Sequence, residues 1–103
     1  MITIQSQANV AETITLNYEQ VVAVRSFDHN GYVVIAVLTG PIFSQRERID
    51  LVKSIKTMVA EQLSISIDNV VVSYDMELFR AMDSIDDEDK DQLLEKAIRI
   101  TER

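Results

Sequence analysis

Cysteine is absent from this chain of 103 residues, and histidine occurs only once. Without cysteine there are no disulfide bonds, no thiolate nucleophiles and no cysteine-based zinc sites. The one histidine, His29, falls in a polar stretch that is typical of a turn. A Ser or Thr nucleophile needs a base within its reach, and a lone turn histidine gives little support for such a pair. We therefore predict neither a catalytic nor a metal-binding role for His29.

Glycine is also scarce, with two residues in the chain. Walker A and dinucleotide-binding loops require several closely spaced glycines, whereas Gly40 stands alone after a predicted strand. An RNA-binding KH module requires a Gly-x-x-Gly loop in basic surroundings, and neither is present. The acidic run from Asp83 to Asp91 lacks the spacing of an EF-hand loop. We predict no catalytic residue, no cofactor and no metal site, and we expect that the protein is not an enzyme.

Positive charge is in short supply, since ten lysines and arginines stand against seventeen acidic residues, for a formal net charge of −7. Binding of nucleic acid requires a clustered basic surface, and an anionic membrane surface attracts basic segments, so neither is expected as a partner. Arg46, Arg48, Lys53 and Lys56 fall close together in the sequence. Acidic residues are interspersed with them, and the simpler interpretation is a solvated helix face.

Long apolar runs are missing as well. No stretch approaches the roughly 18 apolar residues of a membrane-spanning helix. Residues 1–5 do not show the basic region and apolar run of a signal peptide. We expect either a cytosolic protein or one from which an export segment has been removed.

The composition that remains is that of one folded domain. Hydrophobic residues make up 47% of the chain and charged residues 26%, as in ordinary globular proteins, and the length suits a single core. The aromatic residues are few and lie at the edges of predicted elements, so most are expected in the core: Tyr18, Phe27, Tyr32, Phe43, Tyr74 and Phe79.

The middle of the chain predicts a hairpin of two strands. Residues 20–27 and 32–38 are both rich in Val. The second run is almost entirely apolar, which is typical of a central strand covered on both faces. The turn is predicted at residues 28–31, because Asn30-Gly31 supplies the positive φ angles of a tight hairpin.

The clearest helix follows Gly40-Pro41. Ser44 and Glu47 have the spacing of a capping box, and Phe43 is expected to pack onto the first turns. Apolar residues then recur every three or four positions, at Ile49, Val52, Ile55, Val59 and Leu63. This stripe predicts an amphipathic helix that covers one face of a sheet.

The last third of the chain predicts one strand and two helices. Residues 69–74 are the strand, and Asp75 caps a short helix over residues 76–82. Ser84 is the predicted cap of a second helix from residue 87 to about residue 101. Its acidic first turn and the basic residues near its end both favour the helix dipole.

These elements together predict an α+β fold. Residues 6–17 suit a helix or a strand by spacing alone, and a helix is preferred. Residues 1–83 then form a two-layer αββαβ domain, a three-stranded sheet with helices on one face. Residues 84–103 add an acidic C-terminal helix that is packed on this domain or extends from it.

Three segments also resemble a known family. They are QVVAVRSFDHNGYVVIAVL, a helix ending in VKSIKTMVAEQL, and IDNVVVSYDMELFRAM. Between Gln20 and Met82 this pattern is similar to the YhcN/YlaJ family of sporulation lipoproteins. The shared phrases are Tyr32 to Ile35, Val70 to Ser73, and Asp75 through Phe79 to Met82.

The resemblance implies a non-enzymatic structural or interaction module whose αββαβ domain is similar to ring-building motifs. It implies a place at the forespore or spore envelope of an endospore-forming bacterium, with protein partners or self-association. The chain lacks the family's lipid-attachment cysteine. Membrane contact is therefore expected only if an upstream lipidated segment has been removed, and without the resemblance a cytoplasmic location is expected.

A candidate interaction surface combines basic residues of the long helix with acidic residues before the last helix: Arg46, Lys53, Lys56, Asp86, Asp87, Glu88 and Asp89. The alternative function is that of a small-ligand-binding regulatory domain of the ACT-like kind. Such sensors usually carry a glycine-rich loop after their first strand, where this chain has Ser26-Phe27-Asp28-His29.

Overall fold

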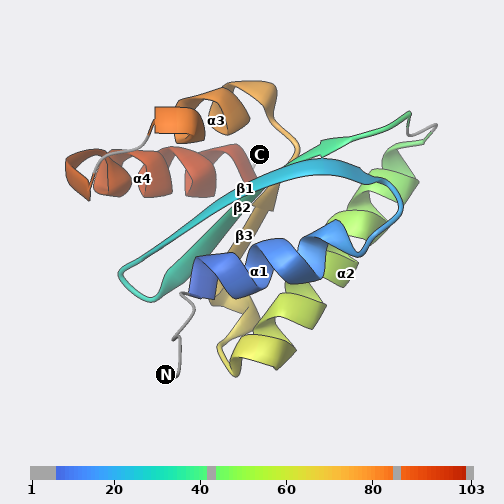
Figure 1. Cartoon of the computed structure of the whole chain (residues 1–103), viewed down its shortest axis with the longest axis horizontal. Helices are drawn as coiled ribbons and strands as arrows, with labels where there is room; N and C mark the ends of the chain where they lie inside the picture. Colours follow the sequence, from blue (N-terminus) through green and yellow to red (C-terminus); the bar gives the residue numbers. More distant parts are fainter. Residues whose placement is uncertain (1–6, 42–43, 85–86, 102–103) are drawn as a thin grey trace, which may run out of the picture.

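The computed structural model describes residues 7–41, 44–84 and 87–101. They form a three-stranded sheet with helices on both faces (Figure 1). In chain order the main elements are α1 (Gln7–Leu16), β1 (Val21–His29), β2 (Tyr32–Thr39), α2 (Gln45–Leu63), β3 (Val70–Ser73), α3 (Met76–Ala81) and α4 (Lys90–Thr101). Short 3-10 helices are η1 (Ile67–Asn69), η2 (Met82–Ser84) and η3 (Asp87–Asp89). The predicted α+β class, with its three-stranded sheet and C-terminal helix, is confirmed.

The hairpin turn is tighter than predicted. β1 continues to His29, which pairs with Tyr32, so that only Asn30 and Gly31 form the loop. Their φ angles are 51° and 81°. A two-residue loop with positive φ at both positions matches the twist of the flanking strands, and strand pairing therefore persists through two residues that the sequence assigned to the turn.

β2 is the central strand of the sheet. The strand order is β1-β2-β3, with β1 antiparallel and β3 parallel to β2. Helix α2 makes the crossover that a parallel pair requires. Residues 33–37 are at most 1% exposed, which confirms that this strand is covered on both faces.

One face of the sheet carries the core expected for the αββαβ unit. Val33, Ile35 and Val37 of β2 point to this face, together with Val70 and Val72 of β3. They pack against apolar side chains of α1 and α2, namely Ala11, Leu51, Ile55, Val59 and Ala60. The alternation of side chains along each strand assigns these positions to one face.

The other face carries a second core, built with the C-terminal helices. Val34, Ala36 and Val71 alternate with the residues of the first core and point the opposite way. They pack against α3, η2 and α4 through Leu78, Phe79, Met82, Leu94 and Ala97. Of the two arrangements expected for the last helix, packing on the domain is the one observed. Helices were expected on one face only, but α3 and α4 both pack on the second face, so the domain has three layers rather than two.

The first helix is attached to β1 by polar contacts as well as by its apolar face. The amide of Ala8 donates to the Asp28 carboxylate at 3.0 Å, and the Ser26 hydroxyl donates to the Ala8 carbonyl at 2.8 Å. Residues 7–16 are thus a helix, as preferred from the sequence.

Two of the predicted helix caps are present. The Ser44 hydroxyl accepts from the Glu47 amide at 3.1 Å, and the Asp75 carboxylate accepts from the Leu78 amide at 3.0 Å. The last α-helix begins later than predicted, at Lys90, because residues 87–89 form a 3-10 turn. The predicted contact of Phe43 lies outside the described residues.

Arg25 links β1 to α3 and η2, which pack on the second face of the sheet. Its guanidinium donates to the Phe79 carbonyl at 2.9 Å, pairs with the Asp83 carboxylate at 2.9 Å, and lies over the Phe79 ring at 4.3 Å. A hydrogen bond, an ion pair and a ring contact made by one planar group together hold the guanidinium in a fixed position.

If α4 is part of the core, Leu94→Ala lowers the free energy of unfolding by about 2–5 kcal/mol, because it leaves a cavity under a helix. The Leu94 side chain is 8% exposed. Urea denaturation measures the change, and Gln92→Ala, at an exposed position of the same helix, is the control. Equal stability of the two variants would show that α4 does not pack on the sheet.

Candidate functional site

Exposed apolar side chains gather in one groove of the molecule. Seven large hydrophobic residues of the described chain are exposed: Leu16, Val22, Ile49, Met58, Ile67, Tyr74 and Met76. Four of them, Ile49, Ile67, Tyr74 and Met76, line a groove of about 690 Å³, and each is between 43% and 56% exposed. Contiguous apolar surface of this kind marks a binding site more often than scattered single residues do.

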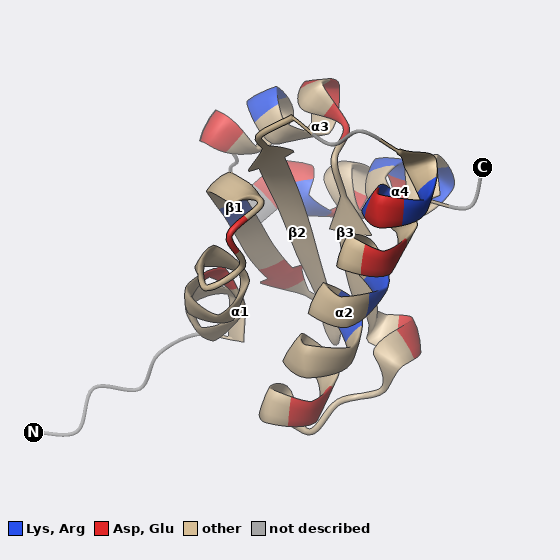
Figure 2. Ribbon diagram, turned by 90° about the vertical axis from the view of Figure 1, so that its right-hand side faces the viewer, with Lys and Arg blue, Asp and Glu red and all other residues tan. Residues whose placement is uncertain are grey.

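The groove lies along β3, between helices from the two faces of the sheet. Its base is formed by Val72 and Ser73 at the end of the strand. Helix α2 forms one side, and Ile100 and Thr101 at the end of α4 contribute to the other. Figure 2 shows β3 at the side of the sheet away from β1, with α2 and α4 beside it.

β3 is an edge strand, but its edge is covered. The sheet order leaves its outer side without a neighbouring strand, yet residues 70–73 are between 1% and 6% exposed. Helices packed on both faces overhang a strand this short. An edge strand otherwise presents free N–H and C=O groups to another chain. The groove therefore offers side chains, rather than an open backbone edge, to a ligand.

The exposure of Ile49 follows from a difference in length. Helix α2 has 19 residues and β3 has four, which corresponds to about 28 Å of helix over about 13 Å of strand. The first turns of α2 therefore extend past the end of β3. The apolar stripe of this helix was predicted to cover the sheet, but its first member, Ile49, is 56% exposed.

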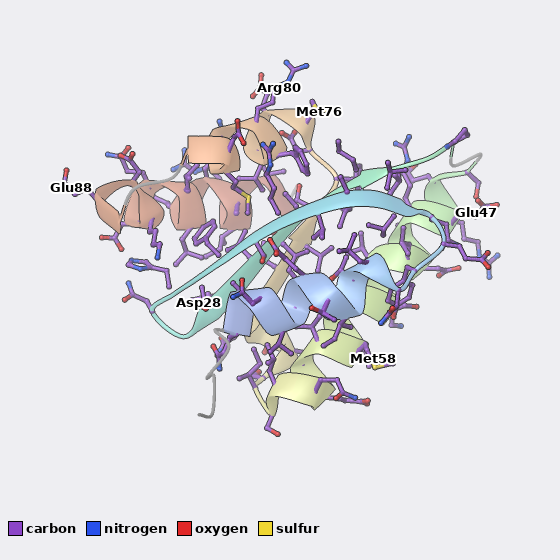
Figure 3. All side chains as sticks on the ribbon, viewed as in Figure 1. Asp28, Glu47, Met58, Met76, Arg80 and Glu88 are labelled. Atoms are coloured by element: carbon purple, nitrogen blue, oxygen red, sulfur yellow. The ribbon has the colours of Figure 1, made fainter. Side chains whose placement is uncertain are left out.

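Tyr74 was also expected in the core, and it is 47% exposed. The Arg48 guanidinium lies over its ring at 5.2 Å, a cation–π contact that holds the ring beside α2. Met76 follows as the first residue of α3, and Figure 3 shows it at the outer side of that helix. The sequence held a signal for the exposure of Tyr74 and Met76, because they flank Asp75, which caps a helix directly after a strand.

Two lysines give the groove a positive side. Lys53 and Lys56, both predicted as interaction residues, line it from α2. Among the described residues, neither ammonium group lies within 4.0 Å of a carboxylate oxygen. Asp75 also lines the groove, but its carboxylate caps α3 through the Leu78 amide. On a chain of net charge −7, an apolar groove thus carries two cations that form no ion pair with the described residues.

The other predicted interaction residues are not brought to this groove. Arg46 is exposed on α2 but does not line it. Residues 87–89 form η3, in which Glu88 and Asp89 are exposed, and Asp86 lies outside the described residues. In Figure 3, Glu88 and Glu47 lie at opposite ends of the molecule. Glu47 is in the first turn of α2. The basic and acidic halves of the predicted surface are therefore separate.

His29 has a partner that the sequence did not suggest. Its Nε2 lies 2.5 Å from an Asp91 carboxylate oxygen, which also accepts from the Asn30 side chain at 3.3 Å. Asp91 lies in the first turn of α4, so the hairpin tip is joined to the third layer. His29 thus makes a contact between β1 and α4.

Neither a metal site nor a membrane span is found in the part of the chain that the structure describes. No group of three or more His, Asp or Glu side chains there could hold a metal ion. No described helix is long and apolar enough to cross a membrane.

Comparison with known proteins adds no identification. No family model matches the chain, and neither a curated protein nor a solved structure matches it. The resemblance to the YhcN/YlaJ family stays a prediction.

We expect the pair of His29 and Asp91 to be weakly coupled, because the Asp91 side chain is 75% exposed. A double-mutant cycle of His29→Ala and Asp91→Ala, measured by urea denaturation, should give a coupling of about 0.2–1 kcal/mol. The same cycle on Glu95 and Arg99, an exposed pair within α4, is the reference. Strictly additive effects of His29→Ala and Asp91→Ala would contradict the contact.

Proposed function

We propose that this chain is a non-enzymatic interaction module that recognises a protein partner through the groove along β3. The observation that carries the proposal is the concentration of exposed apolar side chains there: Ile49, Ile67, Tyr74 and Met76. Burying these half-exposed side chains would stabilise a complex by the hydrophobic effect. The flanking cations give such a contact orientation and specificity.

A role at the forespore or spore envelope is part of the proposal and rests on the resemblance to sporulation lipoproteins. The αββαβ order that the family implies is the order of the first five main elements of this chain. Membrane association is proposed only through a lipidated segment upstream of the domain. Without the resemblance, a cytoplasmic location is proposed.

A small-ligand-binding regulatory domain is the second candidate, and the size of the groove favours it. A volume of about 690 Å³ falls within the range of small-molecule sites, and Lys53 and Lys56 could hold a carboxylate. A thermal-shift screen with amino acids and nucleotides tests this candidate. A rise in Tm with one ligand, lost in Lys53→Gln/Lys56→Gln, would favour the sensor over the interaction module.

Photo-crosslinking tests the interaction module directly. With p-benzoylphenylalanine in place of Met76, we expect a defined protein to be captured in sporulating cells of the source organism, because this residue lies in the groove. The same group in place of Gln92, which is exposed on α4 and does not line the groove, should not capture it. Capture of the same proteins from both positions, or none at Met76, would contradict the proposal.

A pair of matched variants checks that the apolar surface is required. Ile49→Asp introduces a charge into the groove, and Leu16→Asp introduces the same charge at an exposed apolar residue outside it. We expect Ile49→Asp alone to abolish the crosslink. Both variants should keep the wild-type Tm, since both residues are more than half exposed and surface substitutions change stability little.

A further inference from the structure

We infer that the groove along β3 binds a peptide segment of a separate protein in which acidic side chains adjoin apolar ones. This inference rests on the proposed function and names the chemistry of the partner. It draws on charge complementarity and on the distribution of exposed apolar residues over the described chain.

The charge of the groove selects an acidic ligand. Lys53 and Lys56 are three residues apart on α2, and this spacing places two side chains on the same side of a helix. Both line the groove. Their ammonium groups lack carboxylate partners among the described residues, and Arg48 is stacked on Tyr74 nearby. The carboxylates of a ligand could therefore pair with the ammonium groups of Lys53 and Lys56, which form no ion pair with the described residues.

The apolar residues of the groove require apolar side chains in the same segment. Ile49, Tyr74 and Met76 lie where α2, β3 and α3 come together, and Ile67 lies in η1, just before the strand. Half of each side chain remains in solvent. A small ligand held by the two lysines would leave several of these side chains exposed, whereas a peptide along the groove would cover them.

Strand addition is not the binding mode that the groove favours. The residues of β3 are at most 6% exposed, so a peptide cannot reach the strand's free backbone groups unless the flanking helices move. Recognition therefore depends on side chains that fill the groove, as when an amphipathic helix binds to an apolar groove.

A second copy of this chain is a poorer occupant, although it has an acidic end. Glu88, Asp89 and Asp91 are exposed there, but the large apolar side chains nearby, including Leu94, are in the core. None of the exposed large hydrophobic residues of the described chain lies between residues 77 and 101. The described part of the chain's acidic end therefore offers no exposed large apolar side chain to the groove.

Fluorescence polarisation with two labelled peptides tests the inference. One peptide repeats Glu-Glu-Leu-Phe, and the other repeats Lys-Lys-Leu-Phe with the same apolar content. We expect saturable binding of the acidic peptide alone, weakened as salt is raised. Lys53→Glu/Lys56→Glu should weaken this binding about tenfold or more and allow the basic peptide to bind. Lys53→Gln/Lys56→Gln should weaken it without that reversal.

The control is Arg80→Glu/Lys96→Glu, which changes the net charge equally at exposed residues outside the groove. The inference would be overturned if this control weakened binding of the acidic peptide as much as Lys53→Glu/Lys56→Glu does. It would also be overturned if the wild-type protein bound the basic peptide as tightly as the acidic one. Concentration-dependent dimerisation that Lys53→Glu/Lys56→Glu abolishes would assign the groove to a second copy and also overturn it.

The outcome is separable from that of the proposed function. A crosslinked partner at Met76, with no binding of the acidic peptide, would reject the chemistry of the ligand and leave the interaction module standing. If neither the crosslink at Met76 nor binding of the acidic peptide is observed, both the ligand chemistry and the interaction module are rejected.

Discussion

The complete burial of the central strand is the constraint on which the rest of the structure depends. Residues 33–37 of β2 are all apolar and are at most 1% exposed. A strand with apolar side chains on both faces needs cover on both faces. The first helical layer, α1 and α2, covers one face only. The C-terminal helices are therefore required by β2 itself, and α4 is part of the domain's core.

The same constraint produces the groove. Helices long enough to cover the sheet extend beyond β3, which has only four residues. Their overhang covers the edge of the strand, which protects it from pairing with other chains. It also leaves Ile49 of α2 with no strand beneath it, and this side chain remains half in solvent. One part of the apolar groove thus arises from the mismatch between the lengths of α2 and β3.

Features of the chain that depend on local pattern could be predicted from the sequence. Asn30-Gly31 specifies the turn, the caps at Ser44 and Asp75 begin their helices, and the apolar run of β2 indicates a central strand. Each of these depends on residues within a few positions. The sequence also assigned Lys53 and Lys56 to an interaction surface, and they line the groove.

Features that depend on distant segments could not be predicted. The exposure of Ile49 depends on the length of β3, a strand more than twenty residues further along the chain. The contact of His29 with Asp91 joins residues 62 positions apart. The separation of the basic and acidic residues depends on how α4 packs, because its apolar stripe alone does not say which part of the sheet it meets. The proposed chemistry of the partner, too, could be argued only once Lys53 and Ile49 were placed in one groove.

The most direct test of the groove as the binding surface is amide chemical-shift mapping by NMR during titration with the Glu-Glu-Leu-Phe peptide. The largest shifts are predicted on three sides of the groove, in residues 49–56, 72–76 and 100–101. Shifts centred on β1 around Val22, which is 68% exposed and lies outside the groove, would contradict this and assign binding to the other edge of the sheet.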